Sequence, residues 1–230
     1  GGHAVIEFSN RIVTGTVTIA VVLAVLGSLI RQPRRKDLTW LSLGLVAGVV
    51  GQIVLGGVSV LFDLAPPFVM GHFLLSMVLV WIGVVLVARA RRDDDISHAV
   101  ASDRTTTSLT RALGVCAGIL LSLGTAVTGA GPHGGDESAE RLNIPLYYIA
   151  RIHSGAAWVF TALLLTCLVK LAKSAALTRA FRSAQLTVAI VAAQITVGYT
   201  QYFLDVPAGL VLVHVGLATA LWVSVLWTNT

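Results

Sequence analysis

The chain has 230 residues, of which 56% are hydrophobic and only 12% carry a charge. A water-soluble domain carries about 25% charged residues, so this composition excludes a soluble fold, a disordered chain and a disulfide scaffold, and it indicates a polytopic membrane protein. The net charge of +5 does not indicate a nucleic-acid partner, because the basic residues stand in short clusters between apolar runs, as in the cytoplasmic loops of membrane proteins.

Seven apolar runs are long enough to cross a bilayer, which takes about 20 helical residues. Together they predict an all-α, polytopic transmembrane helix bundle. Two cysteines, Cys116 and Cys167, fall inside these runs and are expected to be small core side chains. In chain order the runs cover residues 11–30, 38–62, 68–88, 111–130, 146–169, 183–204 and 208–228.

The basic residues predict how the bundle is oriented. The loops after the first, third and fifth runs hold 13 of the 16 Lys and Arg residues. Loops rich in Lys and Arg stay in the cytoplasm, so these three loops are expected inside. Residue Gly1 is then outside and the C-terminus is cytoplasmic.

An internal repeat relates two parts of the chain that are 142 residues apart. The first three helices then correspond to the last three, which predicts an eighth helix before residue 1 and two four-helix halves related by a pseudo-two-fold axis along the membrane normal. The halves are residues 1–90 and 111–230, joined by a cytoplasmic linker at 91–110. The shift superposes scarce residue types at three pairs of positions: Gln52 and Gln194, Asp63 and Asp205, and His72 and His214.

Three histidines lie inside the apolar runs, where ionisable side chains are costly and indicate function. His153 and His214 lie roughly 10–12 Å below the outer loops, and His72 roughly 8 Å below them, at 1.5 Å per helical residue. Two histidines at one depth on neighbouring helices are the arrangement that ligates a heme iron from both faces. A zinc site is less favoured because no second His or Cys follows one turn away. For each His alone, a hydrogen bond between helices is the alternative.

The first half differs, because Asn10 takes the place that His153 has in the repeat. Asn is not a usual iron ligand, so the two halves are not expected both to hold a low-spin heme between two histidines. Glu7 is one helical turn before Asn10 and Arg11 and can face the same side. A carboxylate and a guanidinium beside an open heme position can take part in the reaction or bind a propionate. Alternatively, the two groups form an ion pair at the start of the helix.

Four other residues are candidates for binding a heme. Arg151 precedes His153 by two residues and is a natural bidentate partner of a propionate, with snorkelling to the interface as the alternative. His133 lies in a Gly-rich loop that can cover a cofactor edge, or it is a solvated side chain. Gln52 and Gln194 can bond a propionate, although a hydrogen bond between helices is favoured.

Several segments together resemble heme A synthase, over about residues 5 to 225. The resemblance implies eight transmembrane helices in two four-helix halves, in a multi-pass protein of the bacterial plasma membrane. It implies an enzyme that oxidises the C8 methyl group of heme O to a formyl group, which gives heme A for terminal oxidases. The segments are IEFSNR at 6–11, GQIVLGG at 51–57, HF at 72–73, VTGAGPHGGD at 127–136, RIH at 151–153 and LVHVG at 212–216.

The same resemblance assigns roles to individual residues. It implies a b-type heme on His153 and His214, and the substrate heme O in the N-terminal half with Glu7 and His72 near its iron. The family's second substrate-side His maps to Asn10, a variant that resembles actinobacterial members. This departure counts against any mechanism that needs two substrate-side ligands.

The expected partners follow from that role. The b-type heme would relay electrons from a membrane donor, for which a quinol is the candidate, and heme O synthase is the candidate supplier of substrate. The lipid bilayer surrounds the chain, and a homo-oligomer is a further expectation. Two other functions remain open, a membrane b-type cytochrome for electron transfer and a non-catalytic heme-binding protein; extracted pigments separate them, because only a synthase makes heme A.

Overall fold

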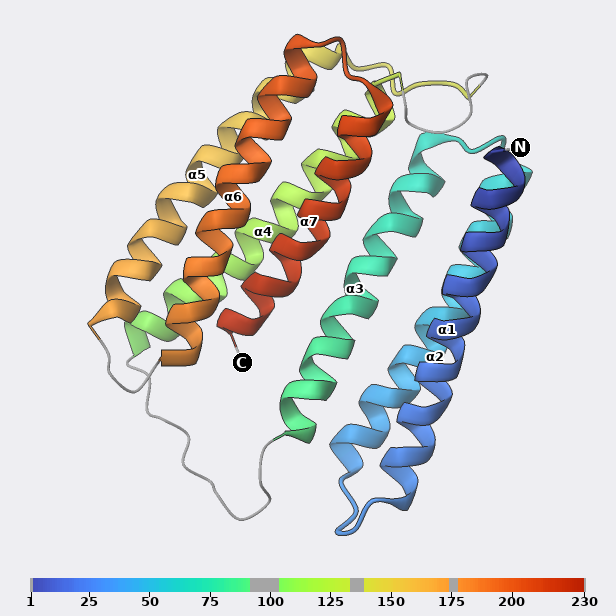
Figure 1. The fold of residues 1–230 in the computed structure, drawn as a ribbon, viewed down its shortest axis with the longest axis vertical. Coiled ribbons are helices and arrows are strands. Elements are labelled where there is room, and N and C mark those ends of the chain that lie inside the picture. Colours follow the sequence, from blue (N-terminus) through green and yellow to red (C-terminus); the bar gives the residue numbers. More distant parts are fainter. Residues whose placement is uncertain (1, 92–103, 133–138, 174–177, 230) are drawn as a thin grey trace.

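The computed structural model describes residues 2–91, 104–132, 139–173 and 178–229, without the side chains of residues 2–7, 9, 10 and 178. Within these ranges the chain forms seven α-helices and no strand, and each helix holds a stretch long and apolar enough to span a membrane. The predicted all-α transmembrane bundle is therefore confirmed (Figure 1). The helices are α1 (Gly2–Ile30), α2 (Lys36–Leu61), α3 (Pro66–Ala90), α4 (Arg104–Ala130), α5 (Leu146–Ala172), α6 (Thr178–Phe203) and α7 (Ala208–Thr228).

The helices extend beyond the apolar runs that predicted them. Helix α1 begins at Gly2 rather than at residue 11, and α4 begins at Arg104 rather than at residue 111. A helix of 27 residues is about 40 Å long, whereas the hydrocarbon core is about 30 Å thick. The additional turns therefore project into the polar interface, where side chains need not be apolar.

The hairpins α2–α3 and α6–α7 turn in the same way. The loop after α2 and the loop after α6 each hold two consecutive non-glycine residues with left-handed backbone, which costs about 1–2 kcal/mol per residue. The second of these residues donates its N–H back into the helix, from Leu64 to the carbonyl of Ser59 at 2.8 Å and from Val206 to that of Gln201 at 2.7 Å. The left-handed residues are Asp63 (φ 50°), Leu64 (55°), Asp205 (57°) and Val206 (57°).

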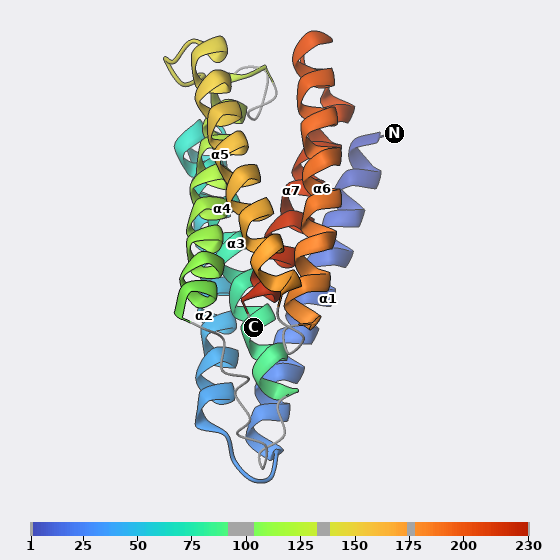
Figure 2. The same ribbon diagram turned by 90° about the vertical axis from the view of Figure 1, so that its left-hand side faces the viewer.

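Helices α4 to α7 form a packed four-helix group, and α3 lies against α4 and α7 (Figures 1 and 2). The Trp222 indole N–H of α7 donates to the Met77 carbonyl of α3 at 2.9 Å. Helix α1 lies against α2, and of its described side chains only Val21 and Ser28 are buried. The interior of the four-helix group is formed by Leu113, Ala117, Phe160, Leu164, Cys167, Leu171, Ala184, Val191, Leu221 and Val225.

A close approach at the C-terminal end of α4 requires a glycine. A Cβ at Gly129 would lie 3.0 Å from Leu142 and 3.1 Å from Pro66, the first residue of α3. The Gly129 carbonyl also accepts a hydrogen bond from the Leu142 N–H at 3.0 Å. This glycine thus lets the loop after α4 and the start of α3 pack over one end of the four-helix group.

Candidate cofactor site

A cavity of about 570 Å³ lies inside the four-helix group, and part of its wall comes from α3. Its lining is mostly apolar, with few polar side chains. Sites for cofactors and other small molecules have volumes of about 300–1,000 Å³ and this mixture of a hydrophobic wall and a few polar groups. The cavity therefore has the size and the lining of a cofactor site.

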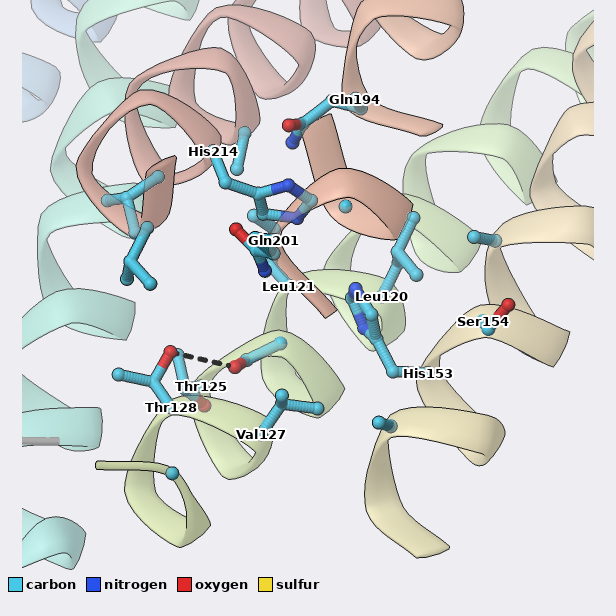
Figure 3. Close-up of a pocket in the computed structure, with 18 of the residues that line it drawn as sticks. Leu120, Leu121, Thr125, Val127, Thr128, His153, Ser154, Gln194, Gln201 and His214 are labelled. Carbon is cyan, nitrogen blue, oxygen red and sulfur yellow. Dashed lines mark hydrogen bonds between the residues drawn. The ribbon is translucent and has the colours of Figure 1, made fainter. Parts of the chain in front are cut away.

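Two imidazole rings face one another across this cavity, His153 from α5 and His214 from α7 (Figure 3). Their ring centroids are 6.4 Å apart and their planes meet at 61°. Two imidazoles on opposite faces of one metal ion have centres roughly 6 Å apart, since each metal–nitrogen bond is about 2 Å and each ring radius about 1 Å. The observed separation suits one iron between the two rings.

A glycine on a neighbouring helix supports each ring. The Cε1 atom of His153 is 3.3 Å from the position that a Cβ would take at Gly124 of α4, and the Cε1 atom of His214 is 3.2 Å from that position at Gly198 of α6. In both rings Nδ1 lies on the same edge, and Nε2 is more than 4 Å from the glycine. The edge of each ring thus lies on a helix backbone, and Nε2 is the nitrogen that faces away from it.

Two buried glutamine side chains of α6, Gln194 and Gln201, line the cavity, and their Oε1 atoms have no hydrogen-bond partner. Nearly all buried polar atoms in proteins are paired, so amides without partners beside a cavity indicate a place for a polar ligand. The NH2 group of each amide can donate to a propionate, and Nε2 of His153 and His214 faces away from the glycines and suits iron. The residues present therefore fit a heme.

Arg151 lies at the edge of the same cavity. Its side chain is exposed, and its guanidinium lies 5.8 Å from the centre of the Tyr147 ring. A guanidinium at this position can reach a propionate at the mouth of the cavity. His133, the other candidate near this end, lies outside the described residues.

His72 has a comparable local setting on α3. Its Cε1 atom is 3.4 Å from the position of a Cβ at Gly56 of α2, and its Nδ1 is buried without a hydrogen-bond partner. The Gln52 amide of α2 donates to the His72 carbonyl at 3.1 Å and to the Ser76 hydroxyl at 2.7 Å. Gln52 thus links α2 to α3 through its own side chain.

Gln194 differs from Gln52 although both occupy the same place in the predicted repeat. Ala218 stands on α7 where Ser76 stands on α3, so Gln194 lacks that hydroxyl acceptor. The Oε1 atom of each glutamine lacks a hydrogen-bond partner, but only the Gln194 side chain lines the cavity, whereas the Gln52 amide donates to α3. Gln52 therefore joins two helices, whereas Gln194 is available to a cofactor.

This difference predicts that the two glutamines contribute unequally to the stability of the cofactor-free protein. Gln52→Leu removes two hydrogen bonds between helices and should lower the free energy of unfolding by about 1 kcal/mol. Gln194→Leu is the matched control and should leave it unchanged. Thermal unfolding of the purified protein in detergent measures both, and equal shifts in the two variants would contradict the assignment.

The remaining candidates lie on α1. The helix contains Glu7, Asn10 and Arg11, so the structure places them on consecutive turns. The Arg11 side chain is exposed, and the side chains of Glu7 and Asn10 lie outside those described. Among the described residues, no group of three or more His, Cys, Asp or Glu side chains is placed to hold a metal ion.

Two features of the cavity were not predicted from the sequence. One is Gln201, which lies seven residues after Gln194. The other is a hydrogen-bonded cluster between α5 and α6, in which the Tyr199 hydroxyl is 3.1 Å from the Ser154 hydroxyl and accepts from the Trp158 indole at 3.4 Å. No residue spacing marks these side chains, because they meet only through the packing of two helices.

Comparison with known families gives one match. The model of the COX15-CtaA family, described as cytochrome oxidase assembly protein, matches residues 2–137, which is more than half of the chain. The match includes His72 and α1, and it ends before His153 and His214. No curated protein matches the chain. The role of the histidine pair therefore rests on its geometry.

Proposed function

Since the chain belongs to the COX15-CtaA family of cytochrome oxidase assembly proteins, we propose that it is a heme A synthase. The family match confirms the resemblance indicated by the sequence, and it implies a role in making heme A for the oxidase. The proposed reaction converts the C8 methyl group of heme O to a formyl group. The observation that adds most to the family match is the pair of imidazoles facing one another across a cofactor-sized cavity.

We assign the cavity in the C-terminal half to a b-type heme. His153 and His214 would hold its iron, and Gln194 and Arg151 would bind its propionates. When bound, this heme supplies an iron that accepts and passes on one electron at a time. The mostly apolar lining excludes water from the two imidazoles and holds them at their observed separation.

We assign the substrate heme O to the N-terminal half. His72 is the axial ligand proposed for it, and Gly56 and Gln52 fix that residue's ring and backbone. Arg11 would orient a propionate. Glu7 would accept a proton or stabilise positive charge that develops at the methyl carbon. With a quinol as electron donor, each oxidation requires dioxygen as co-reactant: one oxygen atom enters the carbon as a hydroxyl group, and the other leaves as water after taking up two electrons and two protons. Two such steps at the methyl carbon give a hydrate, and loss of water leaves the aldehyde.

The surroundings of the enzyme are part of the same proposal. The loops α1–α2, α3–α4 and α5–α6 carry most of the Lys and Arg residues and are assigned to the cytoplasmic side of a bacterial plasma membrane. The substrate-side residues and the histidine pair then lie towards the outer surface. A quinol is the proposed electron donor, and heme O synthase is the proposed source of substrate.

Formation of heme A in cells that make heme O tests the proposal directly. The chain should yield heme A on pigment extraction, and Glu7→Gln should lower that yield by about 100-fold if Glu7 moves a proton in the reaction. Glu140→Gln is the matched control, since Glu140 is an exposed glutamate of the α4–α5 loop and should be replaceable.

Two outcomes would contradict this assignment. Undiminished heme A in the Glu7→Gln variant would remove Glu7 from the mechanism. A parent chain that binds b-type heme and produces no heme A or hydroxymethyl precursor would instead be a membrane cytochrome or a heme-binding protein.

A further inference from the structure

A second hollow lies away from the histidine cavity, at the end of the bundle where α3 ends and α6 begins. It is a groove of about 860 Å³ between α6 and α7, with Arg91, the residue that follows α3, at its rim. The proposed heme chemistry uses none of its residues. The length of the groove and its positive charge nevertheless indicate that it binds a ligand.

The length of the groove matches one leaflet of a bilayer. Along α7 it runs from Gly216 to Trp227, eleven residues or about 16 Å. Half of a hydrocarbon core about 30 Å thick is about 15 Å. The exposed surface of Gly216 and Ala220 forms a shallow floor, and the apolar side chains of Leu186 and Ile190 form a wall. Such a slot fits a single acyl chain lying along α7.

The end of the groove at the membrane surface is positively charged. Arg91 and Arg179 line it with exposed side chains, and the Arg91 guanidinium lies 5.9 Å from the centre of the Trp227 ring. Arg179 is the second residue of α6, where the helix dipole adds positive potential. None of the described residues that line the groove is acidic. A tryptophan beside two arginines is typical of the headgroup level of a membrane.

Hydrogen bonds below the groove hold α6 and α7 together. The Ser183 hydroxyl donates to the Ser224 carbonyl at 2.8 Å, and the Ser224 hydroxyl donates to the Ser183 carbonyl at 3.1 Å. The side chain of Thr187 also bonds to that of Ser224, which is buried. These polar contacts hold the two helices together beneath the groove.

We propose that the groove binds an anionic phospholipid. Its phosphate lies between Arg91 and Arg179, and one acyl chain lies on the floor of Gly216 and Ala220. Basic pockets between transmembrane helices bind such headgroups, whereas a zwitterionic headgroup would bring its own positive charge close to the two guanidiniums. The small residues also permit close contact with a second copy of the chain, which the experiment below tests as the alternative occupant.

Native mass spectrometry of the full chain in detergent tests the site with added phosphatidylglycerol and with phosphatidylcholine of the same acyl chains. We expect phosphatidylglycerol to bind about tenfold more tightly, and Arg91→Ala/Arg179→Ala to remove that preference. Arg34→Ala/Lys36→Ala is the matched control, because these exposed basic residues lie at the same end of the bundle outside the groove. Glycerol phosphate should not compete, since it lacks the acyl chain.

A second variant tests the groove itself. No heavy atom lies within 4 Å of a Cβ at Gly216, so Gly216→Phe should fold, fill the slot and lower lipid binding about tenfold. The proposal would be overturned if the two lipids bound equally, or if binding were unchanged in the double arginine variant or in Gly216→Phe. It would also be overturned if the chain formed a dimer that Gly216→Phe dissociates. None of these outcomes bears on heme A formation, which is measured separately.

Discussion

Replacing either His153 or His214 with alanine should abolish the low-spin b-type heme of the purified protein. Each imidazole supplies one axial ligand, and no other histidine among the described lining residues can take the place of the ring that is lost. A heme that remains in the cavity would be high-spin, with one axial ligand. The optical spectrum of the reduced protein and the ratio of extracted heme to protein measure the change.

His72→Ala is the control for this result, because it removes a membrane-buried imidazole from α3 without touching the pair. It should keep the low-spin spectrum. Retention of full low-spin heme in His214→Ala would show that the iron has another ligand, and loss of the spectrum in His72→Ala would show that the two halves do not bind their hemes independently.

The positions of the helices could be predicted from the sequence, but their ends could not. An apolar run marks the part of a helix inside the hydrocarbon core, and each of the seven runs lies within or close to an observed helix. Helix α1 begins nine residues before its run. Residues outside the core carry no apolar signal, so hydropathy does not show where the helix begins.

The depth of the histidines stays a prediction from helical rise and the position of the loops. The distance between His153 and His214 could not be predicted from the sequence, because it depends on how α5 and α7 pack across the four-helix group. The surroundings of the two glutamines could not be predicted either. Gln52 and Gln194 look equivalent in sequence, and the change from Ser76 to Ala218 on the opposing helix gives them different surroundings.

The repeat in the sequence contains two of the three glycines that face the histidines. Gly56 and Gly198 lie in the repeated segment, each four residues after its glutamine, and each lies against the histidine of the next helix. A glycine in a transmembrane helix often marks close packing of two backbones. Here the partner is the edge of an imidazole, which a pattern of small residues does not reveal.

Enlarging one of these glycines should displace a heme ligand without changing the ligand itself. In Gly124→Val the Cβ would lie 3.3 Å from Cε1 of His153, and in Gly198→Val it would lie 3.2 Å from Cε1 of His214. The additional methyl groups come closer still, so the ring must move away from the helix. Residues that orient a ligand typically contribute 10–100-fold to metal affinity, and we expect heme affinity to fall by about that factor.

Gly118→Val is the matched control, since Gly118 is also on α4 and no heavy atom lies within 4 Å of a Cβ there. It makes the same change in helix propensity and adds the same volume, so it should retain heme and the low-spin spectrum. Thermal unfolding of the cofactor-free variants separates loss of fold from loss of ligand geometry. If Gly118→Val lost heme as strongly as Gly124→Val, the effect would come from the helix and not from contact with the imidazole. If Gly124→Val and Gly198→Val bound heme normally, the glycines would not be what holds the rings in place.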